Sequence, residues 1–250
     1  MLTSVRSLMA ATALAGALAA TPALAQEEEA TPSVTVTGSA TVTSDYRFRG
    51  VSLSGGDPAI QGGITVTHES GVYVGTWGSS IDDGGTDIYG EMELDLFAGW
   101  SGEVSDGVKV DVGILLYAYP TNEFGPVDYW EPYASVAGTF GPVTAKLGMA
   151  YAWDQDGLGS NDNFYIYTNF DTAIPGAPVT LSAHLGYTDG VLAPPLLAGT
   201  GDDSGLDWSL GGAVTVLPGL SIGASYVGVE GPSIDGFTDD TIVGTLTYAM

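Results

Sequence analysis

The segment VTAKLGMAYAW, residues 143–153, places an apolar residue at every second position. Its odd positions are Val143, Ala145, Leu147, Met149, Tyr151 and Trp153. Successive side chains of a β-strand point to opposite faces, so the segment predicts a strand with one continuous apolar face. A tilted strand crosses a bilayer in about 9–11 residues, and this segment is long enough.

The same alternation recurs along the chain from Val34 onward, and no segment with helical periodicity competes with it. Most of the alternating segments have nine or more residues, whereas strands of soluble proteins have a mode of about 5–6. The expected strands, twelve in all, lie at approximately 34–49, 58–68, 71–80, 86–100, 107–119, 128–139, 142–153, 162–172, 178–188, 206–217, 219–230 and 240–250. Pro132 falls inside one of them and predicts a bulge or a shorter strand there.

The connections alternate in length. Tight turns such as Phe140-Gly141-Pro142 alternate with longer loops such as PTNEFGPVD, residues 120–128. This alternation is typical of a transmembrane barrel, in which backbone polar groups pair within the closed sheet. We therefore expect an all-β fold, a transmembrane antiparallel up-and-down β-barrel of about 12 strands over residues 34–250. A soluble sandwich or barrel with its apolar face inward is the alternative.

The first 25 residues have the pattern of a secretory signal peptide. Arg6 precedes a short apolar stretch, and Ala23-Leu24-Ala25 has the form of a cleavage site. Residues 1–25 are therefore expected to direct export and to be removed, leaving a short acidic tail at 26–33 ahead of the barrel. We expect the mature chain in the outer membrane of a Gram-negative bacterium.

The mature chain would carry four basic residues against 30 acidic ones, a formal net charge of −26. So negative a chain argues against nucleic acid as a partner and suits cations and cationic solutes. It has no cysteine, and its 37 glycines are about twice the usual share of roughly 7%. Apolar strand faces joined by acidic, glycine-rich loops account for this composition.

Two of the four basic residues stand close together in the stretch SDYRFRG, residues 44–50. Asp45, Arg47 and Arg49 share the parity of the polar row of the first expected strand. An arginine facing lipid at the bilayer midplane would cost about 2–4 kcal/mol. We therefore expect these three residues to point into the lumen, near the loop end of that strand.

Six further acidic residues are expected on the lumen wall or at its constriction: Asp87, Glu91, Glu93, Asp95, Asp111 and Glu131. One hypothesis is that the arginines pair with some of these carboxylates and form a charged constriction. The other is that they only neutralise a crowded acidic interior, because lumen-facing charge serves either purpose. The sequence leaves both open.

The stretch SDYRFRGVSLSGGDPAIQGGITVTHESGVYVGTW, residues 44–77, resembles the opening segment of the TorF-like family of bacterial outer-membrane porins. The segments EMELDLFAGW and YWEPYASV fit later strands of that family more loosely. The resemblance implies an outer-membrane barrel with pore activity. It supplies neither an established substrate nor catalytic residues.

Other chemistry finds little support in the sequence. Ser182 and His184 share a strand face, but no orienting acid is identified, and we expect no enzyme and no catalytic residues. The loop at Asp154 and Asp156 begins like a calcium loop, but lacks the acidic residue at its twelfth position. We expect no cofactor and no dedicated metal site, and loose binding of calcium or magnesium by the acidic loops stays open.

These observations predict a porin-like channel for passive diffusion of small hydrophilic solutes, with a preference for cations. Its partners would be outer-membrane lipids and small solutes or ions, and association into a homo-oligomer is left open. The alternative is a barrel whose acidic loops bind a surface partner or divalent cations without conducting.

Overall fold

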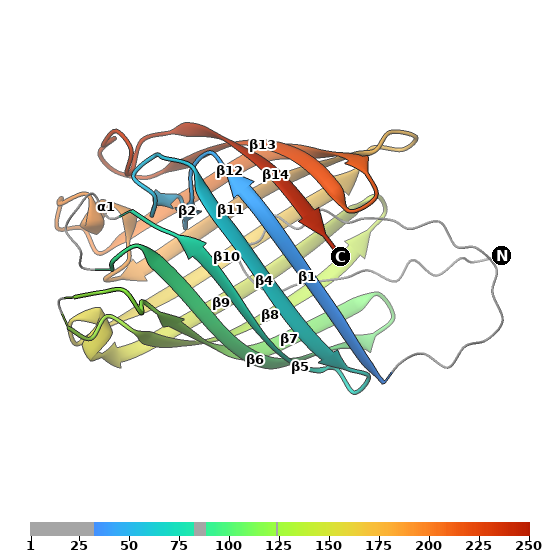
Figure 1. Cartoon of the computed structure of the whole chain (residues 1–250), viewed down its shortest axis with the longest axis horizontal. Coiled ribbons are helices and arrows are strands. Elements are labelled where there is room, and N and C mark those ends of the chain that lie inside the picture. The colour runs from blue at the N-terminus through green and yellow to red at the C-terminus, as the bar shows by residue number, and fades with distance from the viewer. Residues whose placement is uncertain (1–32, 83–88, 124) are drawn as a thin grey trace.

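The computed structural model describes residues 33–82, 89–123 and 125–250. Twelve strands form one closed antiparallel barrel, in which each strand pairs with its neighbours in the chain and β1 closes the sheet against β14 (Figure 1). The barrel strands are β1 Val34–Thr43, β4 Ala59–His68, β5 Val72–Ser80, β6 Met92–Ser105, β7 Val108–Ala118, β8 Tyr129–Phe140, β9 Val143–Gln155, β10 Asn161–Ala173, β11 Val179–Gly190, β12 Ser204–Leu217, β13 Leu220–Val229 and β14 Thr241–Ala249. The predicted fold class is confirmed.

The first strand corrects the sequence-based prediction, which ran from 34 to 49. The barrel strand β1 ends at Thr43, and the chain then forms a separate two-stranded hairpin before returning to the wall at Ala59. Its strands are β2, Arg47–Phe48, and β3, Val51–Ser52. We call residues 44–58 the hairpin segment. It continues the alternation of β1, which is why the sequence pattern did not mark the end of the barrel strand.

The seam between β1 and β14 is short but continuous. The two strands pair from Ser39 opposite Ala249 to Thr43 opposite Thr245. Met250 extends the seam, because its backbone N–H donates to the Gly38 carbonyl at 2.9 Å and its carbonyl accepts from the Gly38 N–H at 3.1 Å. With β1 also paired to β4 along ten residue positions, no barrel strand has a free edge.

The two faces of the wall differ as the alternation predicts. In β9, Leu147, Met149 and Tyr151 are exposed on the outer face, whereas Ala150 and Ala152 are buried on the inner face. The outer face carries most of the exposed large apolar side chains of the described chain. In β5, the valines face outward and Tyr73 and Trp77 face the lumen. The wall is therefore apolar outside and polar or aromatic inside.

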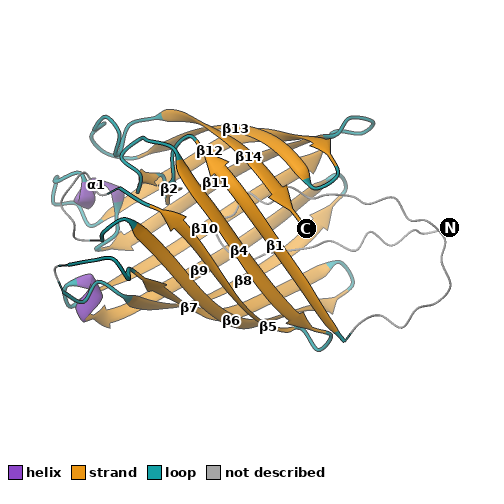
Figure 2. Ribbon diagram, in the orientation of Figure 1, coloured by secondary structure: helices purple, strands orange, loops and turns teal. Residues whose placement is uncertain are grey.

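The connections at the two barrel ends differ in length. One end has turns such as Gly141–Pro142 between β8 and β9, and the other end carries the longer loops (Figure 2). The short helix α1, Pro194–Leu197, and the 3₁₀ turn η1, Asp156–Leu158, both lie at the loop end. Within the described ranges, no helix has the length and apolar character needed to cross a membrane.

Pro132 is accommodated without a break in β8. It stands opposite Ile114 of β7, and no register shift interrupts that pairing. On the other side, the pairing of β8 with β9 begins one residue later, at Tyr133. Beyond that point, the Gln155 side chain takes over the ladder, accepting from the Trp130 N–H and donating to the Trp130 carbonyl, both at 2.8 Å. Pro132 thus lies where the backbone ladder to β9 has ended.

If the outer face meets lipid, arginine should be costly in the middle of a strand and tolerated at its end. Val112→Arg, in the middle of β7, should lower the free energy of unfolding by about 2–4 kcal/mol, whereas Val104→Arg, near the turn end of β6, should lower it by about 0–1 kcal/mol. Equilibrium unfolding in phospholipid vesicles measures both. Equal losses at the two positions would contradict a lipid-facing wall.

Candidate functional site

The hairpin segment folds into the lumen at the loop end of the barrel. Its turn consists of Arg49 and Gly50, both with positive φ, 48° and 80°. Two-residue hairpin loops commonly have positive φ at both positions, and glycine accepts this backbone at no cost. A Cβ at Gly50 would also collide with the Val229 side chain of the wall. At Arg49, in contrast, a residue with a side chain is held in a backbone conformation that such residues rarely adopt. Strain of this kind persists only where the surroundings impose it.

Arg49 is held by a cluster of groups on the opposite wall. Its Nη2 donates to both carboxylate oxygens of Glu131, each at 2.7 Å, and both side chains are buried. The guanidinium carbon lies 4.2 Å from the Tyr165 ring centroid and 4.7 Å from the Phe48 ring centroid. The Tyr117 hydroxyl donates to Glu131 at 3.2 Å. We call Glu131, Tyr165 and Tyr117 the arginine socket.

Other parts of the hairpin segment reach further strands. The Tyr46 hydroxyl donates to Glu93 of β6 at 3.0 Å, and its ring packs edge-on against Trp77 of β5 with centroids 5.5 Å apart. Phe48 packs in the same way against Tyr117 of β7. Within the segment, Asp45 accepts hydrogen bonds from the Ser52 and Ser54 hydroxyls at 2.7 and 3.1 Å. The segment is thus anchored to β5, β6, β7, β8 and β10.

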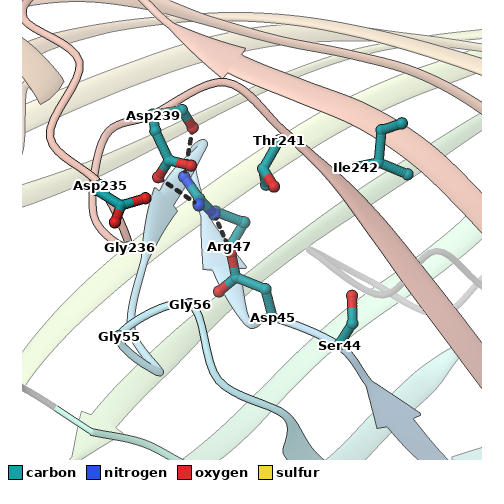
Figure 3. Close-up of a pocket in the computed structure, with 10 residues that line it drawn as sticks. All are labelled: Ser44, Asp45, Arg47, Gly55, Gly56, Asp235, Gly236, Asp239, Thr241 and Ile242. Atoms are coloured by element: carbon teal, nitrogen blue, oxygen red, sulfur yellow. Dashed lines mark hydrogen bonds and ion pairs between the residues drawn. The ribbon is translucent and has the colours of Figure 1, made fainter.

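Arg47 joins the hairpin segment to the loop between β13 and β14. It pairs with Asp45 and donates to the Asp239 carboxylate and the Asp239 carbonyl, both at 2.9 Å (Figure 3). A pocket of about 440 Å³ opens between the segment and this loop, and Asp235 also lines it. Burial opposes the charge on Asp239, but the hydrogen bond and charge of Arg47 outweigh it. The pKa of the Asp239 carboxyl therefore lies below its usual range.

The hairpin segment divides the lumen into a dry part and a wetter part. Around the socket, Glu93 is 1% exposed and Glu131 is 3% exposed, and Tyr117 and Tyr129 are buried with them. Charged groups on the wall of an open channel would be in contact with water. Side chains nearer the turn end, among them Lys109, Lys146 and Asp171, are only half-buried. In this structure the lumen is therefore filled at the level of the socket.

The wetter part carries the two lysines and a histidine. Lys109 and Lys146 stand in one row on either side of Ala137, and the Lys146 ammonium lies 5.7 Å from the Tyr167 ring centroid. His184 Nε2 lies 2.8 Å from an Asp207 carboxylate oxygen, and Nδ1 contacts the Asn169 side-chain oxygen. Together with the two arginines, every lysine and arginine of the described chain therefore faces the interior of the barrel.

The predicted wall residues that the structure describes fall into three groups. Glu93, Asp95, Asp111 and Glu131 lie buried on the inner face of β6, β7 and β8. Asp45, Arg47 and Arg49 also lie inside, but on the hairpin segment instead of a barrel strand, which corrects their predicted position. Glu91 is exposed in the loop ahead of β6, and so does not lie on the inner wall. Asp87 lies outside the described residues, as do the expected signal segment 1–25 and residues 26–32 of the tail.

Sequence reasoning missed the aromatic half of the site. Tyr165 supplies the face on which Arg49 lies, and Tyr117 and Tyr46 bind two of the lumen carboxylates. Tyr117 lies an even number of residues from the inward-facing Asp111 of β7, and Tyr165 is spaced in the same way from other inward-facing residues of β10. Strand alternation therefore indicates that both rings face the lumen. No comparable signal pairs Arg49 with Glu131, because the two residues are 82 positions apart.

The residues considered for other chemistry adopt ordinary roles. Both ring nitrogens of His184 are engaged by Asp207, Tyr165 and Asn169, and no hydrogen bond between described residues joins it to Ser182. The other histidine of the described chain, His68, is exposed at the end of β4, where its Nδ1 lies 2.9 Å from the Ser70 hydroxyl. In the part of the chain that the structure covers, no group of three or more His, Asp or Glu residues is arranged to hold a metal ion.

The geometry defines a class of protein: a twelve-stranded barrel of the outer-membrane type with an internal hairpin held by an arginine socket. Over residues 27–247 the chain matches the family described as "Bacterial protein of unknown function (Gcw_chp)". The chain belongs to this family. The TorF-like name suggested by the opening segment is not confirmed. No curated protein matches the chain in sequence.

Several solved outer-membrane porins and channels share the fold. The NanC porin is 8% identical with a TM-score of 0.56, and the match covers 86% of this chain and 98% of that chain. The KdgM porin in complex with disordered oligogalacturonate has the same identity and coverage and a TM-score of 0.57. The COG4313 outer membrane channel from Pseudomonas putida F1 is 13% identical with a TM-score of 0.52, covering 91% and 99%. At these identities the likeness establishes the fold.

Removing the carboxylate of the socket should destabilise the protein. Glu131→Gln leaves the buried Arg49 guanidinium without its counter-charge, which should lower the free energy of unfolding by about 3–5 kcal/mol. The double variant Arg49→Met/Glu131→Met should recover much of that loss, because apolar groups replace both charges. Unfolding in lipid vesicles, followed by tryptophan fluorescence, measures these changes. Exposed Glu91→Gln is the matched control and should change stability by less than about 0.5 kcal/mol. A double variant as unstable as the single one would contradict this role.

The loop contact of Arg47 should weaken in acid. Because the pKa of Asp239 is lowered in the folded protein, the contact contributes fully above the ordinary Asp value of about 3.9 and is lost as the pH falls through the lower folded-state value. Pepsin cleavage within residues 230–240 should therefore increase below about pH 4. Asp239→Asn should be cleaved readily across the acid range, and Asp235→Asn should follow the wild type. Identical pH profiles for wild type and Asp239→Asn would argue against the contact.

Proposed function

We propose that this protein is an outer-membrane, porin-like channel for passive diffusion of small hydrophilic solutes. The observation that carries the proposal is a closed barrel with an apolar outer face and a charged inner face. An apolar exterior suits lipid, and a wall of ionisable side chains suits an interior that meets water or polar solutes. The dry level around the socket represents a closed state, in which the hairpin segment blocks the passage.

We further propose that the channel prefers cations. All lysines and arginines of the described chain lie inside the barrel. The mouth therefore carries exposed carboxylates such as Asp82, Asp202 and, at the end of β9, Asp154, with no lysine or arginine among them. Fixed charge of one sign concentrates the opposite ions at a channel entrance. One porin of the same fold is described in complex with oligogalacturonate. Because that porin is only 8% identical, its ligand is not assigned to this chain.

The sealed level of the lumen favours a second candidate. In that candidate, the acidic loops bind a surface partner or divalent cations, and the hairpin segment keeps the barrel permanently shut. The pocket lined by Asp45, Asp235 and Asp239 lies at the loop end, where such binding would occur. Conductance separates this candidate from the channel.

Planar bilayers test the channel directly. Folded protein inserted under a potassium chloride gradient should give discrete conductance steps. The reversal potential should have the same sign as the equilibrium potential of potassium. Neutralising mouth carboxylates, as in Asp154→Asn/Asp202→Asn, should move that potential toward zero, because the fixed charge at the entrance falls. An anion-selective reversal potential would reject the cation preference. Electrically silent bilayers containing demonstrably folded protein would reject the channel.

A further inference from the structure

We propose that the arginine socket is a binding site for guanidinium-bearing solutes, that Arg49 occupies it as a built-in ligand, and that such a solute opens the lumen by displacing Arg49. The release of the hairpin segment rests on the proposed channel function, whereas binding to the socket does not.

The socket has the chemistry that recognises a planar cation. A guanidinium is bound best by a carboxylate in its plane and by an aromatic face above it, and the socket supplies both through Glu131 and Tyr165. Tyr117 fixes one carboxylate oxygen by donating to it. The site lies inside a strongly acidic chain, which favours cationic over anionic occupants.

Arg49 is an imperfect occupant of this socket. It uses one nitrogen, Nη2, for both carboxylate oxygens, and its Nη1 is buried without a hydrogen-bond partner. Its backbone is also held at a φ of 48°. A free guanidinium has no such tether, so it can align two nitrogens with the two oxygens in the stronger fork geometry. The socket is therefore occupied in a way that a solute can improve.

The surroundings of the socket contain further unsatisfied acceptors. Glu93 Oε2 and Asp95 Oδ1 are buried on the adjoining strand β6 without partners. Buried acceptors without a donor are costly, and the cost is removed by water or by a donor on a solute. The closed position of the hairpin segment thus leaves polar groups that an incoming cation, or the water admitted with it, would satisfy.

Displacement of Arg49 has a direct route to opening. Arg49 lies at the tip of the hairpin segment, which is covalently joined to the wall only at Thr43 and Ala59. Near its return to the wall, the segment contains Gly55 and Gly56, both with positive φ, a conformation that only glycine adopts freely. Loss of the Arg49 contact removes the anchor to β8 and β10. The contacts of Tyr46, Phe48 and Arg47 remain, together with the backbone hydrogen bonds that join Ser52 to Phe237 and Leu53 to Asp82.

Binding is tested without any need for conduction. Methylguanidinium is titrated into folded protein in detergent and followed by calorimetry. Arg49→Ala vacates the socket and should bind the probe at least about tenfold more tightly than the wild type. In the wild type Arg49 occupies the socket, and the apparent affinity for the probe is reduced to the fraction of sockets that are empty. Adding Glu131→Gln to Arg49→Ala should abolish the gain. Asp111→Asn in the same background is the matched control, a lumen carboxylate bound to Tyr73 outside the socket, and should leave the affinity unchanged.

Two results would overturn the binding site. One is an Arg49→Ala variant that binds methylguanidinium no more tightly than the wild type. The other is a gain that survives Glu131→Gln. Folding of each variant is checked by its β-sheet circular dichroism. If Arg49→Ala does not fold, Arg49→Lys takes its place, because lysine keeps the charge but cannot present a planar group, and it should also bind the probe more tightly than the wild type.

Release of the hairpin segment is tested in bilayers. Millimolar methylguanidinium should raise the open probability of the wild type and have no such effect on Glu131→Gln. Unchanged gating in a conducting wild type would overturn the release step. A barrel that never conducts, yet binds the probe through Glu131, would refute the channel and leave the binding site standing. The two proposals therefore fail in distinguishable ways.

Discussion

The closed backbone ladder is the constraint on which the rest of the structure depends. Hydrocarbon offers no partner to a peptide N–H or C=O, so every strand that faces lipid must be paired on both sides. Here β1 pairs with β4 on one side and with β14 on the other, and Met250 extends the seam through the Gly38 backbone. Once the sheet is closed, side-chain parity alone decides which residues face lipid and which face the lumen.

Closure also explains where the charge lies. With lipid outside, ionisable residues away from the strand ends are driven inward, and a twelve-stranded barrel has a narrow interior in which to place them. The chain meets this crowding by folding residues 44–58 into the lumen. Arg49 then neutralises Glu131, and hydroxyls of Tyr46 and Tyr117 bind neighbouring carboxylates. The contacts that make the interior stable are the same contacts that fill the lumen, so any opening must replace them with water or solute.

The sequence predicted the wall well because one rule, alternation at a period of two, governs every lipid-facing strand. The row from Val143 to Trp153 became β9 with the expected face outward. The same rule failed at the hairpin segment. Tyr46 and Phe48 continue the apolar row of β1, but they pack against Trp77 and Tyr117 inside the lumen. Apolar parity cannot distinguish lipid from an aromatic interior, and the contacts that decide the matter, above all Arg49 with Glu131, are distant in sequence.

The sidedness of the wall is the central claim, and spin labels at two adjacent residues of β9 test it most directly. The chain has no cysteine, so single cysteines at Lys146 and Leu147 can be labelled without interference. In phospholipid vesicles, the label at Leu147 should collide with oxygen dissolved in the bilayer, and the label at Lys146 with a water-soluble nickel complex. The reverse pattern, or equal access at both positions, would contradict a barrel with lipid outside and a polar lumen within.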